Sequence, residues 1–341
     1  MIAHLLSQKG PVLKNEGTKN NQIGVPLTLL KMGPKHQFAV LELGMSERGE
    51  IGNLSRMAAP TLGVITNIGP AHLAHLGSLG AVFACKMEIL EGLEKGRALV
   101  VNRGDPFLKG ATSLHHQIVF FGKGSAFRAS HLEGRKAHQS YRFNDDLEGT
   151  LPLIGEHDVE NALAAITVAS LQGVSPFLSI ERLKDFKGLE GRMCSKQVEG
   201  ISFIDDTYNA NPESTRRALE SFAKLPTAGR RIFVMGDMLE LGEDAPAYHA
   251  ALGEEIILSG IDFFLAVGEL SRSTHEKVLS LGMDGSRSLH VRTPQEAAKR
   301  LSEYVRKGDT VLVKGSRSMK MEEVIQTVAS FTNAEVPELN A

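Results

Sequence analysis

The sequence predicts an α/β protein of two domains, the second built on a doubly wound parallel sheet. Three observations lead to this prediction. A chain of 341 residues has room for two domains at about 100–200 residues each. Between residues 201 and 341, five β-branched or aromatic runs alternate with helical patterns. The 34 glycines fit the many tight turns that such alternation requires.

Composition narrows the class of protein. Hydrophobic residues make up 42% of the chain and charged residues 23%, which is ordinary for a folded globular protein. The net charge of −2 provides no overall basic field, so we expect no nucleic-acid partner. No apolar run approaches the roughly 18–20 residues that span a bilayer, so we expect no membrane span. Two cysteines are too few for a disulfide framework and fit a reducing cytoplasm.

The second domain is the easier one to divide into elements. Its helices have clear start signals: Asn211 caps one with Pro212 at the first helical position, and Thr293 to Glu296 resembles a capping box. We expect further helices over 245–258 and 270–281, and a last one after Arg317. The expected strands are 201–204, 231–235, 263–267, 288–291 and 310–313.

The first domain alternates less cleanly. Met1–Leu6 reads as part of an amphipathic helix, and residues 122–153 read as a polar hairpin insertion. A stretch rich in Lys, Gly and Asp near 184–191 marks the boundary, which gives domains of 1–187 and 188–341. The expected strands are 38–41, 62–66, 98–101 and 117–121, and the expected helices are 81–91 and 159–171.

The strongest motif runs from Asp205 to Pro212, where a strand ends and a helix begins. Ligands of open α/β sheets bind beyond the carboxyl ends of the strands. Two adjacent acids there suit ribose hydroxyls or a cation, and asparagine amides suit a base edge or a phosphate. A helix cap with a solvated turn is the alternative reading. The residues of this motif singled out as candidates are Asp206, Tyr208, Asn209 and Asn211.

A second motif, Lys314-Gly-Ser316-Arg317, also follows a strand directly. Its cations, hydroxyl and glycine suit a carboxylate or a phosphate. Arg192, beside Gly191 at the presumed hinge, could bind the same kind of group. The alternatives are a basic turn for the motif and an ordinary surface arginine for Arg192.

A dispersed set of polar residues occupies the first domain. Glu42 ends a strand as the acid that holds Mg²⁺ does in many ATPases. Asn67, His72 and Lys86 follow the next strand, although a histidine would be an unusual magnesium ligand. Each of these taken singly fits a loop or a solvated helix face. His157 and Asn161, four residues apart at a helix start, share one face and suit either a nucleotide contact or an N-cap cluster.

Together these motifs resemble the Mur ligases of bacterial cell-wall synthesis, in particular the branch that adds D-Ala-D-Ala. The resemblance runs from residue 20 to about 325 and is specific in its combination rather than in single motifs. It includes Asn20-Asn21-Gln-Ile-Gly-Val-Pro, Glu42-Leu-Gly-Met, Thr66-Asn67-Ile-Gly-Pro-Ala-His72-Leu, Cys85-Lys86-Met-Glu-Ile, Gly155-Glu-His157 through Asn161, Gly191-Arg192, Asp205 through Pro212, Gly236-Asp237-Met-Leu-Glu-Leu-Gly and Lys314-Gly-Ser-Arg317.

The resemblance implies a central ATPase domain followed by a Rossmann-like C-terminal domain. It implies that ATP and Mg²⁺ activate the carboxylate of a UDP-N-acetylmuramoyl-tripeptide as an acyl phosphate, which the amine of D-Ala-D-Ala then attacks in a cleft closed by hinge motion. The metal ligands would be Glu42, His72 and a carbamylated Lys86. ATP contacts would be His157, Asn161, Arg192, Asp206, Tyr208, Asn209 and Asn211; substrate contacts would be Asn20, Asn21, Asn67, Ser316 and Arg317. The catalytic residues would be Glu42, His72, Lys86, Arg192 and Lys314. We expect a monomer.

One feature departs from the family pattern. The phosphate-loop pattern Gly-x-x-x-x-Gly-Lys-Ser/Thr is absent, and Met1–Leu6 resembles the helix that follows this loop in the family. We therefore expect a ligase cut just after its phosphate loop, with an incomplete first domain and little activity on its own. The alternatives are a non-catalytic binding fragment, or a related ligase of the folylpolyglutamate or cyanophycin synthetase type.

Overall fold

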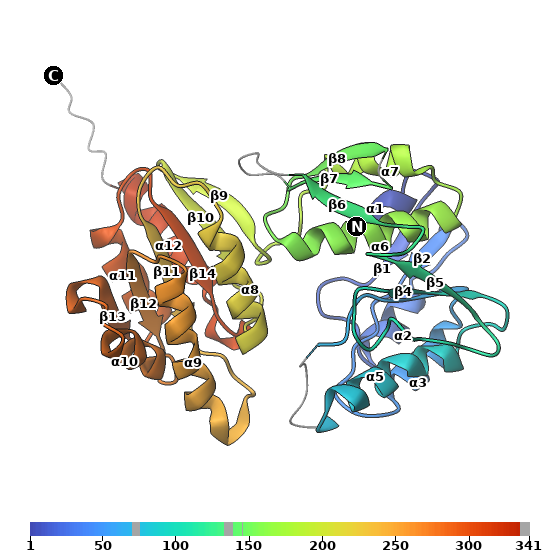
Figure 1. Cartoon of the computed structure of the whole chain (residues 1–341), viewed down its shortest axis with the longest axis horizontal. Helices are drawn as coiled ribbons and strands as arrows, with labels where there is room; N and C mark the ends of the chain where they lie inside the picture. Colours follow the sequence, from blue (N-terminus) through green and yellow to red (C-terminus); the bar gives the residue numbers. More distant parts are fainter. Residues whose placement is uncertain (70–75, 133–138, 145, 335–341) are drawn as a thin grey trace. The chain divides into compact units, whose positions relative to one another are not determined.

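The computed structural model describes residues 1–69, 76–132, 139–144 and 146–334. The chain divides into two compact units (Figure 1). Unit 1 comprises Met1–Pro152 and Glu156–Phe186, and unit 2 comprises Leu153–Gly155 and Lys187–Ala341. Each unit has its own sheets and core and is described separately.

Unit 2 is built on one six-stranded sheet, in the order β13-β12-β11-β14-β10-β9. The first five of these strands run parallel, which confirms the predicted doubly wound sheet. The sixth, β9, pairs antiparallel with β10 at the edge and was not predicted. The strands are β9 (Cys194–Val198), β10 (Ile201–Asp206), β11 (Arg231–Gly236), β12 (Phe263–Val267), β13 (Ser288–Val291) and β14 (Thr310–Lys314).

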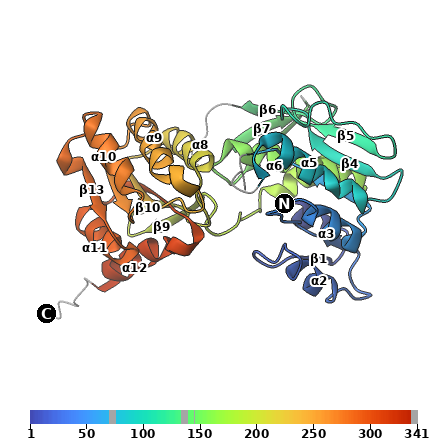
Figure 2. The ribbon, with the colours of Figure 1, turned by 90° about the horizontal axis from the view of Figure 1, so that it is seen from below.

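Helices cover both faces of this sheet, as Figures 1 and 2 show. Because successive strand residues point to opposite faces, a strand buried on both sides is a continuous apolar run. In β11, Phe233 and Met235 join the core under α8, α9 and α10, while Ile232 and Val234 join the core under α11 and α12. The helices are α8 (Pro212–Ala223), α9 (Ala245–Leu258), α10 (Arg272–Ser280), α11 (Pro294–Tyr304) and α12 (Glu322–Ala334).

The predicted helix starts are present in unit 2. Asn211 Oδ1 accepts the N–H of Ser214 at 2.8 Å, and Ser214 Oγ accepts the N–H of Asn211 at 3.1 Å, a complete capping box. Thr293 Oγ1 likewise accepts the N–H of Glu296 at 3.2 Å. The predicted box at Thr293 is only half formed, because the Glu296 carboxylate accepts from the N–H of Arg292 instead.

In its described residues, unit 1 contains three small sheets. Strands β1 (Val12–Lys14) and β2 (Phe38–Val40) form a parallel pair. A three-stranded parallel sheet has the order β3-β4-β5, and a three-stranded antiparallel sheet has the order β6-β7-β8. The antiparallel sheet occupies the segment read as a hairpin, with one strand more than a hairpin has. The remaining strands are β3 (Leu62–Ile65), β4 (Ala98–Asn102), β5 (Gln117–Phe121), β6 (Ala129–Leu132), β7 (Gln139–Phe143) and β8 (Leu147–Leu151).

The helices of unit 1 differ from the prediction in two ways. Three of the described helices, α2, α3 and α7, were not predicted, and one predicted helix ends early. A single helix was expected over 81–91, but the α-helix α5 ends at Met87 and a 3₁₀ turn, η1, covers Glu88–Glu91. The Glu88 carboxylate accepts the N–H groups of Gly49 and Gly52 at 2.9–3.2 Å, at the start of α3. The helices are α1 (Ile2–Leu6), α2 (Gly24–Leu29), α3 (Glu50–Ala58), α5 (Leu79–Met87), α6 (Glu156–Leu171) and α7 (Pro176–Leu183).

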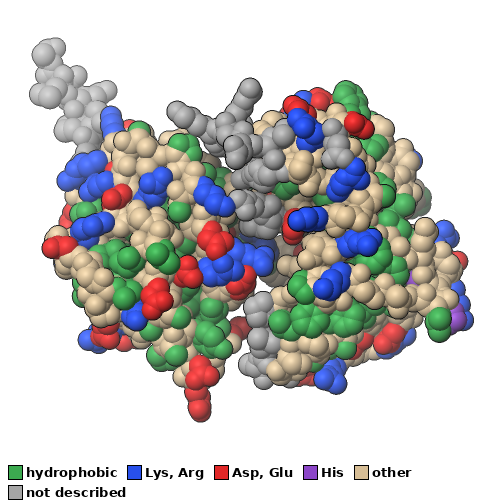
Figure 3. Space-filling model, in the orientation of Figure 1, with side chains coloured by type: hydrophobic (Ala, Val, Ile, Leu, Met, Phe, Trp, Pro, Cys, Tyr) green, Lys and Arg blue, Asp and Glu red, His purple; other side chains and the backbone are tan. Residues whose placement is uncertain are grey.

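Charged side chains of both signs are interspersed over the face drawn in Figure 3. On α8, Arg216 and Arg217 both pair with Glu213 one helical turn away, at 2.9 and 2.8 Å. Such exposed pairs contribute roughly 0.3–0.5 kcal/mol each.

In the described part of the chain, no helix combines the length and apolar character that a membrane span requires.

Candidate active site

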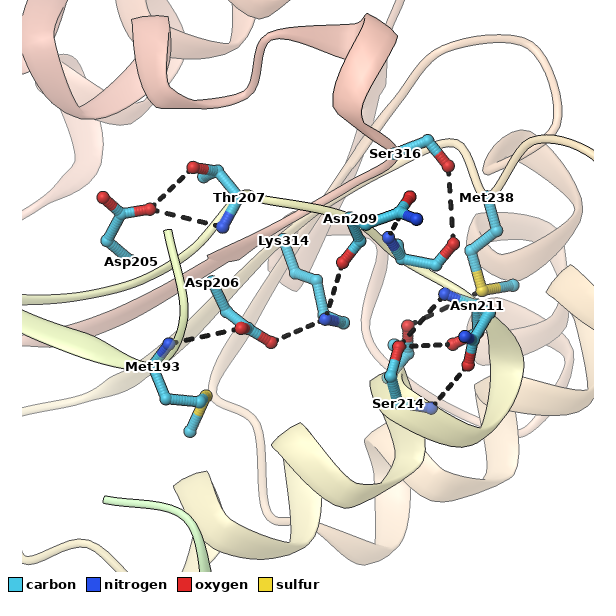
Figure 4. A network of polar contacts seen from close by, with 12 residues as sticks. Met193, Asp205, Asp206, Thr207, Asn209, Asn211, Ser214, Met238, Lys314 and Ser316 are labelled. Carbon is cyan, nitrogen blue, oxygen red and sulfur yellow. Dashed lines mark hydrogen bonds and ion pairs between the residues drawn. The ribbon is translucent and has the colours of Figure 1, made fainter. Parts of the chain in front are cut away.

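The carboxyl ends of β10 and β14 carry a buried ion pair in unit 2 (Figure 4). Asp206 and Lys314 are register partners, and Lys314 Nζ lies 2.6 Å from Asp206 Oδ2. The Lys314 side chain is 3% exposed and that of Asp206 13%. Lys314 Nζ also donates to the carbonyl of Asn209 at 2.9 Å. The pair therefore ties the loop after β10 to the end of β14.

The two neighbouring acids, Asp205 and Asp206, have different partners. The second carboxylate oxygen of Asp206 accepts the N–H of Met193 at 3.2 Å. Asp205 is buried and binds Lys196 on β9 at 2.7 Å and the Thr207 hydroxyl at 2.7 Å. Asp205 therefore fastens the edge strand β9 to the sheet.

Arg192 lies with its guanidinium over the ring of Tyr208, 4.0 Å from the ring centre. The N–H of Tyr208 donates to the carbonyl of Gly191 at 2.9 Å, which holds the two segments together. Gly191 has φ +72°, and a Cβ there would lie 2.9 Å from the Tyr208 nitrogen. Glycine at this position thus permits the approach that stacks the arginine on the aromatic ring.

The remaining candidates of the β10 loop have local partners. Asn209 Oδ1 accepts the N–H of Ala210 at 2.9 Å, and the Asn211 side chain caps α8. The alternative reading of Asn211 as a helix cap is therefore correct for its side-chain oxygen. Asn209 is exposed.

Ser316 and Arg317, which follow β14, lie in different environments. Ser316 is buried: its hydroxyl accepts the N–H of Leu239 at 2.8 Å, and its own N–H donates to the carbonyl of Asp237 at 3.0 Å. Arg317 is exposed and pairs with Glu322 at 2.9 Å. Ser316 therefore fixes the loop that follows β11, whereas the Arg317 guanidinium faces solvent.

In unit 1, Glu42 follows β2 and is exposed. Its Oε1 accepts from Asn20 Nδ2 at 2.9 Å, and its main-chain N–H donates to Asn15 Oδ1 at 2.7 Å. The structure thus brings together two residues, Asn20 and Glu42, that the sequence assigned to different roles. Asn21 points elsewhere, because its Oδ1 accepts the N–H groups of Ile23 and Gly24 at the start of α2.

Lys86, on α5, reaches back to the loop that follows β3. Its Nζ donates to the main-chain carbonyl of Asn67 at 2.8 Å. Burial lowers the pKa of the Lys86 amine below its usual value, and the nearby Asp105 carboxylate offsets part of this effect. Asn67 itself is exposed. His72 lies outside the described residues, as does the side chain of His157, whereas Asn161 is exposed on α6.

Two acids that the sequence reading did not assign organise these segments. Asp105, buried in the turn after β4, accepts the N–H groups of Ile68, Phe107 and Leu108 at 2.7, 2.8 and 3.1 Å. It thereby holds the loop whose Asn67 carbonyl binds Lys86. The second is Glu88, described above at the start of α3. The sequence held a signal for Asp105, because this residue follows a predicted strand. It held none for Glu88, because the two glycines that Glu88 binds lie 36 and 39 residues away in the sequence.

The chain matches two family models and is similar to named ligases. The Mur ligase middle domain matches residues 1–169, and the Mur ligase glutamate ligase domain matches residues 191–317. UDP-N-acetylmuramoyl-tripeptide–D-alanyl-D-alanine ligase of Bacillus subtilis (strain 168) is 34% identical over 330 residues, covering 96% of this chain and 72% of the relative. The chain belongs to the Mur ligase family. The Escherichia coli (strain K12) ligase of the same name is 33% identical over 337 residues, covering 96% of this chain and 73% of its own.

Solved structures agree with the family assignment. A crystal structure of MurF from Acinetobacter baumannii superposes with a TM-score of 0.87 at 31% identity, covering 96% of this chain and 73% of that one. MurF ligase from Thermotoga maritima, in complex with ADP, superposes with a TM-score of 0.86 at 26% identity, covering 98% of this chain and 77% of that one. MurC from the same organism, at 21% identity and a TM-score of 0.69, shares the fold. The predicted fold, a Mur ligase middle domain followed by a Rossmann-like domain, is confirmed.

The Mg²⁺ that the resemblance implies would need oxygen donors close to Glu42 and Lys86. Within the described ranges, no group of three His, Cys, Asp or Glu residues is gathered to hold a metal ion. Glu42 is nevertheless an exposed carboxylate with one oxygen engaged by Asn20. A carbamate on Lys86 would add a second carboxylate-like group, and oxygen ligands are those that Mg²⁺ prefers.

Proposed function

We propose that this Mur ligase joins D-Ala-D-Ala to UDP-N-acetylmuramoyl-tripeptide at the expense of ATP. The observation that carries the proposal is the likeness, at 34% identity across 96% of the chain, to a ligase named for that reaction. A related ligase of similar structure was crystallised with ADP, which supports ATP as the phosphoryl donor here.

The reaction proceeds in two steps. A carboxylate oxygen of the tripeptide attacks the γ-phosphorus of ATP, the bond to the bridging oxygen breaks, and ADP leaves. The amine of D-Ala-D-Ala then attacks the acyl carbon, loses a proton and expels inorganic phosphate. Both steps depend mainly on positioning and on neutralising phosphate charge.

Unit 1 supplies the groups for the metal and the acyl phosphate. When bound, Mg²⁺ neutralises charge on the transferring phosphate. Glu42, His72 and carbamylated Lys86 would hold it. The lowered pKa of Lys86 supports the carbamate, because a larger fraction of its amine is neutral and able to attack CO₂. In that step the Nζ–C bond forms and the amine releases one proton.

Unit 2 supplies the groups for the nucleotide and the dipeptide. The Arg192 guanidinium stacked on Tyr208 offers a planar cation for phosphate, and the exposed Asn209 amide offers a donor. The exposed Arg317 guanidinium suits the carboxylate of the dipeptide. Lys314 and Asp206 neutralise each other and hold the Asn209 carbonyl, so they act by fixing this loop. His157 and Asn161 remain predicted nucleotide contacts, and Asn67 and Ser316 predicted substrate contacts.

We place the reaction in the cytoplasm, on the cysteine usage described above, and we assign it to a monomer. Mass spectrometry for the D-Ala-D-Ala-extended UDP-peptide, with calorimetry for ATP and Mg²⁺, tests the function. If the chain forms more of this extended peptide than a Glu42→Gln control does, the proposed ligase function is supported. Binding of ATP without product supports the expected loss of activity. No product and no heat up to millimolar ATP would favour the non-catalytic binding fragment instead.

A further inference from the structure

Two asparagines fix the position of Glu42 from the segment that follows β1. Asn20 Nδ2 donates to Glu42 Oε1 at 2.9 Å. Asn15 Oδ1 accepts the main-chain N–H of Glu42 at 2.7 Å, and Asn15 Nδ2 donates to the Glu42 carbonyl at 3.4 Å. Both the side chain and the backbone of Glu42 are therefore held by neighbouring side chains.

The Asn20 amide is itself confined by Gly44. The carbonyl of Asn20 accepts the N–H of Gly44 at 2.8 Å. A Cβ at Gly44 would lie 2.8 Å from the Asn20 side chain, closer than real Cβ contacts come. Gly44 thus leaves the space in which the Asn20 amide lies against the chain beside Glu42.

These contacts restrain a side chain that is exposed to solvent. Glu42 is exposed, and holding a long exposed side chain in one rotamer costs conformational entropy. The Asn20 NH₂ group donates to Oε1 of the Glu42 carboxylate. Among the described residues, Oε2 of this exposed side chain has no hydrogen-bond partner.

We propose that Asn20 is a positioning residue that orients the Glu42 carboxylate toward a divalent cation, rather than a contact to the UDP-linked substrate. The inference rests on the proposed function, since it takes Glu42 as a Mg²⁺ ligand. Hydrogen bonds to a ligating carboxylate orient it, and removing the partner typically weakens metal binding about 10- to 100-fold.

The neighbouring Asn21 provides a matched control. Its Oδ1 accepts the N–H groups of Ile23 and Gly24 at 3.1 and 2.9 Å, so it stabilises the start of α2. Substitution of Asn21 removes an asparagine of the same segment without touching the Glu42 carboxylate.

The test is Mn²⁺ binding to the full chain, followed by the electron paramagnetic resonance signal of free Mn²⁺. Asn20→Ala, and Asn20→Leu as a variant of similar shape, should weaken Mn²⁺ binding about tenfold. Asn21→Ala should stay within twofold of wild type. In a Glu42→Gln background, Asn20→Ala should cause no further loss. Circular dichroism checks that each variant is folded.

Wild-type Mn²⁺ affinity in both Asn20 variants would overturn the proposal. So would an equal loss of affinity in the Glu42→Gln background, since Asn20 would then act independently of that carboxylate. Failure of the proposed function has a different signature. The wild type would then bind Mn²⁺ through Glu42 yet form no product that depends on D-Ala-D-Ala.

Discussion

Asp206 and Lys314 face each other across neighbouring parallel strands, 108 residues apart in the sequence, with 2.6 Å between Oδ2 and Nζ. Both side chains are largely buried, at 13% and 3% exposure. Removing one partner of a buried pair leaves an uncompensated charge, at a cost of about 3–5 kcal/mol.

We therefore expect Lys314→Met to lower the free energy of unfolding of unit 2 by about 3 kcal/mol. The double variant Lys314→Met with Asp206→Asn should recover part of that loss, because neither charge then remains. Chemical denaturation followed by circular dichroism measures both. Equal instability of the single and double variants would show that the charge of Asp206 is not what Lys314 compensates.

The carbamate on Lys86 predicts a pH-dependent signal. With ¹³C-labelled bicarbonate, a carbamate resonance should be present in the wild type and absent in Lys86→Arg. Because burial holds the pKa of Lys86 below its usual value, the resonance should persist to lower pH than for an ordinary lysine. It should fade as the pH falls through the folded-state pKa. A wild-type spectrum without it at any pH from about 6 to 10 excludes the carbamate, given the usual lysine pKa of about 10.4.

The same shift gives Lys86 a defined effect on stability when it is not carbamylated. Its folded-state pKa is depressed, so the unfolded chain binds more protons between that pKa and the usual lysine value. Stability should therefore rise with pH across this window in CO₂-free buffer. Lys86→Met should remove that part of the slope, which denaturation at a series of pH values measures. An identical slope in the variant would mean that another group is responsible.

Asp105 holds the loop after β3 by three main-chain hydrogen bonds. Asp105→Asn places an NH₂ group against one of these N–H donors, so we expect a loss of roughly 1.5–3 kcal/mol. Hydrogen exchange should quicken at Ile68, Phe107 and Leu108. Asp284→Asn is the control, because Asp284 caps the exposed turn Gly285–Arg287 and should change stability by less than about 0.5 kcal/mol. Unchanged exchange at these three amides would refute the role of Asp105.

The stack of Arg192 on Tyr208 predicts a loss of ATP affinity when either side is changed. An exposed cation–π contact is worth about 0.5–1 kcal/mol, so Tyr208→Ala and Arg192→Lys should each weaken ATP binding about two- to fivefold. Calorimetry with ATP and Mg²⁺ measures this. Tyr248→Ala, on the exposed side of α9, should bind as wild type. The stack would have no part in ATP binding if Tyr208→Ala matched that control.

The sequence predicted most of unit 2, because its parallel strands are continuous apolar runs closed by Gly or Asp. It missed β9, whose polar Ser195, Lys196 and Gln197 carry no core pattern. That strand is held by pairing with β10 and by the ion pair of Lys196 with Asp205, both tertiary contacts. In unit 1, β1 was missed because only two of its three residues, Val12 and Leu13, are apolar, whereas the equally short β2 is apolar throughout.

The sequence predicted that the candidate site consists of residues at strand ends. It did not predict which of these residues contact one another. That Lys314 binds Asp206 depends on β14 lying beside β10, an order that strand patterns alone do not specify. The bond from Asn20 to Glu42 likewise depends on the pairing of β1 with β2. Local signals did identify Asn211 as a cap, because its partner Ser214 is three residues away.

Isotope transfer tests the proposed ligase reaction most directly. The tripeptide carboxylate of the UDP-linked substrate is labelled with ¹⁸O, and the chain is supplied with ATP, Mg²⁺ and D-Ala-D-Ala. An acyl phosphate intermediate predicts that one ¹⁸O appears in inorganic phosphate for each amide bond formed, as mass spectrometry would show. Amide formation with unlabelled phosphate would contradict the account.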